Sequence, residues 1–362
     1  MAISLHHFHH AFRSHAAAQW ALLLAVSVVF VALLEVLHLS AALLLGPMIA
    51  GMLLASAGGR IRVNDTVFVA TQGIIGCMIA RAIPPSILSE VAMKWPIFAL
   101  GVGSTIVIAA LFGWVLTRWR VLPGSSAIWG SAPGGAAAMT VMAEAHGADI
   151  RLVAFMQYLR VLAVTTVASL VASAVGSAHP VAATVWFPDI AWVSFAETLA
   201  LATLGLISSK LFRVRAGALI LPLIAGATLS NMGAMHIELP PWLLAASYAL
   251  LGWAIGLRFT RESLVYCARA LPRVFAAILG LIAACAGVGQ ILAAAAGVDP
   301  LTAYLATSPG GLDAVSIIAT DSNVDVPFVL SMQFARVLVV LATGPWLARK
   351  LSSRSVDPAL PP

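Results

Sequence analysis

Two short stretches of this sequence combine residue types that can bind an ion inside an apolar chain. Residues 131–135 read Ser-Ala-Pro-Gly-Gly, and residues 307–311 read Thr-Ser-Pro-Gly-Gly. Proline removes a backbone donor and glycine frees the backbone, so we expect a helix to break at each stretch. The N–H groups of a new helix N-terminus attract anions. The candidate substrate-binding residues of the two stretches are Ser131, Pro133, Gly134, Gly135, Thr307, Ser308, Pro309, Gly310 and Gly311. A kink that only serves packing is the alternative.

A glutamine and an arginine follow each stretch inside the next apolar run. Gln157 and Arg160 lie three residues apart, and Gln333 and Arg336 repeat this spacing, so each pair shares one helix face. At 1.5 Å per residue, each arginine lies roughly 12–15 Å inside its run. A charge at such depth is a candidate for substrate binding. The alternative is a structural ion pair with one of the nearby carboxylates: Glu144, Asp149, Asp313 or Asp325.

Two of these acidic residues are candidates for a proton or cation site. Asp313 has no acidic counterpart in the first half of the chain, because Ala137 holds the matching position. Glu144 follows the first stretch and can equally be a solvated residue at a helix end. The sequence contains no His-Glu-x-x-His, Walker or Gly-x-Ser-x-Gly motif, and its histidines outside the N-terminal tail are scattered. We therefore expect no enzyme activity, no cofactor and no metal site.

The composition places these residues in a membrane. Hydrophobic residues make up 61% of the 362 positions and charged residues 9%, whereas about 25% of residues are charged in soluble domains. Lipid removes the need for a charged surface. The net charge of +6 does not indicate a nucleic-acid partner, because the basic residues lie in short loops between apolar runs. We expect an all-α integral membrane protein in the bacterial inner membrane.

The apolar runs form two related series. The first series lies near 17–37, 41–57, 66–83, 95–117, 125–143 and 152–175, and the second near 190–209, 216–232, 241–258, 272–295, 301–319 and 327–348. At an offset of 176 residues, 133–164 and 309–340 share 13 identities in 32 positions. The chain is therefore predicted to be duplicated. Its expected parts are a His-rich cytoplasmic tail (1–15), membrane repeats at 16–176 and 190–350, and a second cytoplasmic tail (351–362).

The basic residues predict how the repeats are oriented. With both termini cytoplasmic and about five crossings per half, most loop arginines and lysines fall inside, and Arg81 and Lys94 fall outside. An odd number of crossings inverts the second repeat relative to the first. Each repeat would contain a broken or re-entrant Pro-Gly-Gly element, because irregular backbone at membrane depth must be buried or line a cavity. Inverted repeats place substrate sites at the midplane.

The repeated motif Pro-Gly-Gly followed by Met-Gln-x-x-Arg-Val, as in Met156–Val161 and Met332–Val337, resembles the bacterial AbrB-type membrane protein family. Leu45-Gly46-Pro47-x-x-Ala50-Gly51 adds to the resemblance, which covers about 18–350. Members of that family are often labelled ammonia monooxygenase or regulator. The family looks related to antiporters and anion symporters with inverted repeats and crossed broken helices, so the resemblance implies a transporter-like fold.

Together these features favour a secondary transporter of a small organic anion coupled to H⁺ or Na⁺. The two breaks would meet at the midplane, where Arg160 and Arg336 make the centre positive. The expected partners are the lipid bilayer, the anion, the coupling ion and a second copy of the chain in a homodimer. One alternative is a membrane sensor or scaffold that regulates gene expression through a partner. Another is a membrane-bound monooxygenase, for which the sequence offers no clustered metal ligands.

Overall fold

The computed structural model describes residues 16–36, 42–83, 91–123, 125–174, 186–212, 217–310, 315, 318–319 and 324–352. Within these ranges the regular elements are helices. The first half contains α2 (Ala16–Val36), α3 (Ala42–Ser56), α4 (Asp65–Arg81), α6 (Trp95–Arg118), α7 (Ser126–Ser131), α8 (Ala136–Ala145) and α9 (Ile150–Ala174). The second contains α10 (Trp192–Phe212), α11 (Gly217–Asn231), α12 (Pro241–Gly256), α13 (Arg261–Ala296), α14 (Pro300–Thr307) and α16 (Val326–Ser352).

Six of the described helices are long and apolar enough to cross a membrane: α2, α6, α9, α10, α13 and α16. The shorter helices α3, α8, α11 and α12 are also apolar. On α2, Val28 and Val29 are 59% and 65% exposed, so water would meet a broad apolar face there. Lipid covers such a face without cost. The expectation of an all-helical fold is confirmed for the described residues, and the six long apolar helices are compatible with a multi-pass membrane protein.

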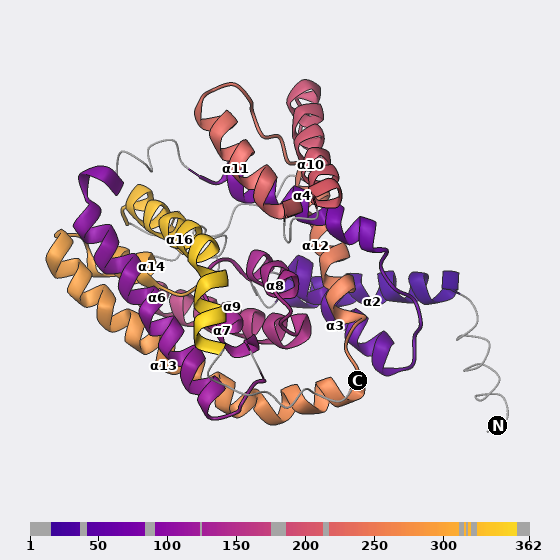
Figure 1. The fold of residues 1–362 in the computed structure, drawn as a ribbon, viewed down its shortest axis with the longest axis horizontal. Helices are drawn as coiled ribbons and strands as arrows, with labels where there is room; N and C mark the ends of the chain where they lie inside the picture. Colours follow the sequence, from indigo (N-terminus) through magenta and orange to yellow (C-terminus); the bar gives the residue numbers. More distant parts are fainter. Residues whose placement is uncertain are drawn as a thin grey trace.

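The helices gather into two groups that each draw equivalent members from both halves (Figure 1). One group holds α2, α3 and α4 with α10, α11 and α12, and its closest pairings are α3 with α12 and α4 with α11. The other holds α6, α7 and α9 with α13, α14 and α16. Helix α8 contacts α7 and α9 in the second group and α4 in the first. The breaks therefore lie in one group, and α8 touches the other.

Glycines allow the close crossings within the first group. A Cβ added at Gly76 of α4 would lie 2.4 Å from the Leu219 carbonyl oxygen of α11. A Cβ added at Gly252 of α12 would lie 2.6 Å from the Leu44 carbonyl oxygen of α3. These contacts correspond residue by residue between the halves. Small residues that let helix backbones approach this closely are typical of helix packing in membranes.

Two expected runs have other boundaries in the structure. The run predicted at 125–143 consists of α7 and α8, which are separated by residues 132–135. The run predicted at 272–295 belongs to α13, a helix of 36 residues that starts at Arg261. The Thr260 side chain accepts a hydrogen bond from the Ser263 N–H and caps this earlier start. At 1.5 Å per residue, α13 is roughly 54 Å long and exceeds the hydrocarbon core of about 30 Å.

Candidate functional site

The first break lies between α7 and α8. Helix α7 ends at Ser131, and the chain turns through Ala132, Pro133 and Gly134 before α8 begins at Ala136. Gly135 has φ +86°, a backbone conformation that side chains with a Cβ rarely adopt. No side chain caps the N-terminus of α8. A glycine therefore suits this position, where the chain enters the second helix.

Helix α9 supplies partners for the open end of α7. The last carbonyls of a helix have no partner within it. The Gln157 Nε2 group donates to the Trp129 and Ala132 carbonyl oxygens at 2.7 and 3.0 Å. The Arg160 Nη1 group donates to the Ser131 and Ala132 oxygens at 2.9 and 3.1 Å. Arg160 Nη2 also donates to Gln157 Oε1 at 2.7 Å, so the predicted pair acts as one unit.

The second break repeats these contacts. Gln333 Nε2 donates to the Leu305 and Ser308 carbonyl oxygens at 2.6 and 3.2 Å. Arg336 Nη1 donates to the Ser308 oxygen at 2.6 Å, and its Nη2 donates to Gln333 Oε1. Each acceptor lies 176 residues after its counterpart at the first break. The backbone between Gly310 and α16 is described only in part, so Gly311 and Asp313 lie outside the described residues.

The two breaks meet each other. A Cβ added at Gly134 would lie 2.8 Å from Val340 Cγ1 of α16, and one added at Gly310 would lie 3.0 Å from Val164 Cγ1 of α9. Each break therefore packs against the long helix of the opposite half. The Arg336 Nε group donates to the Pro133 carbonyl oxygen at 3.1 Å and joins the breaks directly.

The centre holds two buried positive charges. Arg160 is 1% exposed and Arg336 is 2% exposed, so both guanidinium groups are shielded from solvent by the protein. Across the described part of the chain, the ion pairs are Arg151–Asp149 and Arg258–Glu144. Neither central arginine has a carboxylate partner there. Burying a charge without an opposite charge is expensive.

The carboxylates that could have paired with these arginines are used elsewhere. Asp149 pairs with Arg151 at 2.7 Å. Glu144, at the end of α8 remote from the break, pairs with Arg258. Asp325 accepts from the Phe328 N–H at 3.0 Å at the start of α16. Of the four alternatives, this leaves Asp313, outside the described residues.

The predicted hydroxyls differ in their availability. Ser131 Oγ donates to the Ala127 carbonyl oxygen at 2.8 Å, and Thr307 Oγ1 donates to the Ala303 and Cys285 oxygens at 2.9 and 3.1 Å. Both hydroxyls are thus engaged with backbone. Ser308 Oγ is buried and has no hydrogen-bond partner among the described residues.

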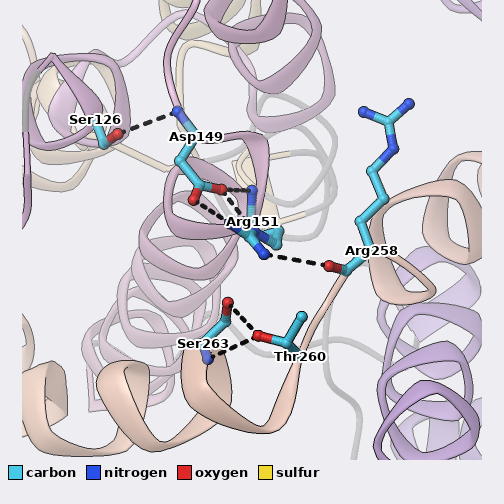
Figure 2. A network of polar contacts seen from close by, with 6 residues as sticks. All are labelled: Ser126, Asp149, Arg151, Arg258, Thr260 and Ser263. Carbon is cyan, nitrogen blue, oxygen red and sulfur yellow. Dashed lines mark hydrogen bonds and ion pairs between the residues drawn. The ribbon is translucent and has the colours of Figure 1, made fainter. Parts of the chain in front are cut away.

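A polar network at one end of α9 was not predicted from the sequence (Figure 2). Asp149 N donates to Ser126 Oγ at 3.3 Å, and the Asp149 carboxylate holds the Arg151 side chain. Arg151 Nη1 donates to the Arg258 carbonyl oxygen at 3.4 Å. The Arg258 guanidinium pairs with Glu144 and lies 5.1 Å from the centre of the Phe68 ring. The network links both helix groups, and no sequence motif signalled it.

An apolar hollow borders the first break on the side of α6 and α16. Its lining includes Ala109, Trp129, Pro133, Val340 and Leu347. Over the described ranges, no three His, Cys, Asp or Glu side chains gather closely enough to hold a metal ion.

Comparison with known proteins identifies the family. Residues 43–352 match the family described as "Transition state regulatory protein AbrB". The chain belongs to this AbrB family. It is 43% identical over 338 residues to the Escherichia coli (strain K12) protein named "Putative regulator AbrB", covering 92% of this chain and 97% of that protein. The AbrB-type resemblance read from the Pro-Gly-Gly and Gln-x-x-Arg motifs is confirmed.

A more distant relative comes from another bacterium. The chain is 27% identical over 298 residues to the Bacillus subtilis (strain 168) protein named "Uncharacterized protein YhjN", and the match covers 77% of each chain. No solved structure matches this AbrB family member.

Proposed function

We propose that this AbrB family member is an inner-membrane secondary transporter of a small organic anion, coupled to H⁺ or Na⁺. The observation that carries the proposal is the pair of buried arginines, Arg160 and Arg336, which have no carboxylate partner among the described residues. The transported anion would supply the missing negative charge. The proposed activity is movement of the anion across the membrane, which requires no enzymatic step, cofactor or resident metal.

The surroundings of the arginines support an anion that carries a carbon skeleton. The N-terminus of α8 has no capping side chain and points its free N–H groups toward the break. The small hollow beside Pro133 has an apolar lining, which would accept at most a small alkyl group of a ligand. An inorganic anion would use the charge and leave the hollow empty.

The matched helix pairings support two inverted repeats that alternate access to the midplane. Equivalent helices of the two halves exchange equivalent contacts, as Gly76 with Leu219 and Gly252 with Leu44 illustrate. The distribution of basic residues favours cytoplasmic termini and an inverted second repeat. Movement of the helix group that holds the breaks against the group of α2–α4 and α10–α12 would expose the centre to each side in turn.

Asp313 is the proposed coupling residue. Glu144 was the other candidate, and its carboxylate is engaged by Arg258 at the far end of α8. Replacing Asp313 by Asn should remove the effect of Na⁺ or pH on anion binding, whereas Glu144→Gln should leave that effect in place. If Glu144→Gln loses the effect of Na⁺ or pH and Asp313→Asn keeps it, Asp313 is not the coupling residue.

A thermal-shift screen of the detergent-solubilised protein tests transport-site binding. The ligands are small anions, amino acids, ammonium and amines, with and without Na⁺ and at two pH values. A ligand that binds the folded state raises the melting temperature. An anion should stabilise the wild type and not a folded variant that lacks the central arginines. Stabilisation by amines alone, or equal stabilisation of that variant, would contradict the proposal.

A regulatory sensor or scaffold is the second candidate, because the Escherichia coli relative carries a regulator's name. A sensor would act through a partner protein and need not move its ligand. If no ligand shifts the melting temperature of well-folded protein, the sensor or scaffold becomes the better account. Metal analysis of the purified protein separates both from a membrane-bound monooxygenase.

A further inference from the structure

The two central arginines differ in how completely the protein satisfies them. Arg336 uses all three guanidinium nitrogens: Nη1 on the Ser308 oxygen, Nη2 on Gln333 and on the Gly310 oxygen at 3.4 Å, and Nε on the Pro133 oxygen. Arg160 uses two nitrogens, and its buried Nε–H has no partner among the described residues. A buried donor without a partner is unfavourable unless a ligand fills the vacancy.

A second unpartnered donor lies at the other break. Ser308 Oγ is buried and without a partner, as Arg160 Nε is. A Cβ added at Gly310 would lie 3.6 Å from Ser308 Oγ and 3.0 Å from Val164 Cγ1. Val164 is one helical turn beyond Arg160 on α9, so the second break, which carries Ser308, packs against the segment of α9 that carries Arg160. The matching position at the first break is Ala132, which has no hydroxyl.

The charge of the centre limits the charge of its ligand. Each arginine caps the C-terminus of a short helix, which carries at most about half a negative charge. Two guanidinium charges offset in this way leave about one positive charge in a buried space. Counting the charges of the described residues, a monovalent anion therefore balances the centre, and a divalent one overcompensates it.

We infer that the two halves have divided their roles: Arg160 Nε and Ser308 Oγ form the subsite for one carboxylate group of a monovalent anion, and Arg336 is a positioning residue that ties the two breaks together. This inference rests on the proposed function. Arg336 reaches Pro133 from the other half, whereas the contacts of Arg160 within the described residues stay at its own break. The tie aligns the two breaks so that Ser308 and Arg160 face one ligand.

Matched variants of the two arginines and of residue 308 test this division. The probes are acetate, lactate and pyruvate as monocarboxylates, and malonate and succinate as dicarboxylates. The readouts are the melting temperature without ligand and the apparent affinity from ligand titration. Arg160→Gln and Ser308→Ala should lower monocarboxylate affinity at least about tenfold. Without ligand, Ser308→Ala should melt as the wild type does, because the Ser308 hydroxyl has no hydrogen-bond partner among the described residues.

Arg336→Gln should lower the ligand-free melting temperature more than Arg160→Gln does, because it severs the tie between the breaks. Arg336→Lys keeps the charge and should still melt below the wild type, because lysine cannot make the forked contacts. If Arg336→Gln cannot be purified, Ser308→Ala and its mirror Ala132→Ser decide the subsite: the first should weaken binding, and the second should leave affinity within about twofold.

Three results would overturn the inference. One is undiminished monocarboxylate affinity in Ser308→Ala. Another is stronger stabilisation of the wild type by dicarboxylates. A third is a larger decrease of the ligand-free melting temperature in Arg160→Gln than in Arg336→Gln. If the wild type binds an anion by way of Arg336, the division of roles fails and the proposed function stands. If no anion binds folded wild type, both fail.

Discussion

At the first break, Arg160 donates to the carbonyl groups of Ser131 and Ala132, both in its own half. At the second break, Arg336 donates within its own half and also to Pro133 in the other. The glutamines of the two breaks make equivalent contacts. The two halves have thus kept the capping of the broken helices, whereas Arg160 Nε and Ser308 Oγ are among the buried donors without a partner in the described residues. Their counterparts differ, because Arg336 Nε donates to Pro133 and Ala132 has no hydroxyl. A site can become asymmetric without losing the symmetric frame that holds it.

Removal of the glutamines tests the symmetric part of this comparison and should have the largest effect. Gln157→Ala and Gln333→Ala each leave backbone carbonyls and a buried arginine short of partners. We expect each variant to lose about 3 kcal/mol of unfolding free energy, and the two losses should be similar. Denaturation in detergent measures this loss, and Gln290→Ala, at an exposed position on α13, is the control. A large loss for one glutamine and none for the other would show that the frame is not symmetric.

Alanine at the first glycine of each pair tests the contact between the breaks. Gly134→Ala and Gly310→Ala would place a Cβ 2.8 and 3.0 Å from valine methyl groups of the opposite half. Overpacking of this kind should cost about 1–3 kcal/mol in each variant. Gly287→Ala is the control, because nothing lies within 4 Å of its added Cβ. If both variants are as stable as the control, the breaks do not pack against α9 and α16 as the structure describes.

Gly135 tests the backbone of the first break. At φ +86° an alanine is strained although the space around it is open, so Gly135→Ala should cost about 1–2 kcal/mol. Gly103→Ala has the same open surroundings in a regular helix and should be neutral or stabilising. Equal melting temperatures of the two variants would mean that the chain does not turn at Gly135.

The smallest expected effect concerns the polar network at the end of α9, whose side chains are more exposed than the central arginines. The Glu144 and Arg258 side chains are 31% and 29% exposed. Glu144→Gln should therefore cost less than about 1 kcal/mol, and the loss should shrink at high salt. Denaturation of the wild type and Glu144→Gln at several NaCl concentrations measures both the loss of stability and its salt dependence. A salt-independent loss of several kcal/mol would place this pair among the buried determinants of the fold.

Much of this arrangement followed from the sequence, because the duplication repeats both the breaks and the spacing of Gln157 with Arg160. Helical periodicity predicted that these two side chains share a face, and the structure places both on the end of α7. The sequence also kept open an ion pair with nearby carboxylates. Proximity along the chain could not exclude Asp149 or Glu144, whose partners, Arg151 and Arg258, are set by the tertiary fold.

The asymmetry between the halves was not predictable from matched residues. Arg160 and Arg336 are identical in type and spacing, and only the crossing of the breaks brings Pro133 to Arg336. The early start of α13 was missed because its first residues are charged, while the cap at Thr260 gave a local signal. The roles of Asp313 and of both termini remain predictions from the sequence.

Anion uptake into proteoliposomes tests the central claim most directly. Wild type, Arg160→Gln and Ser308→Ala are reconstituted, and accumulation of labelled acetate, lactate and pyruvate is followed under an imposed proton or sodium gradient. We expect the wild type to accumulate at least one monocarboxylate above protein-free vesicles, and Arg160→Gln to accumulate none. Folded wild type that accumulates no anion, or Arg160→Gln that matches it, would contradict the account of a central anion site.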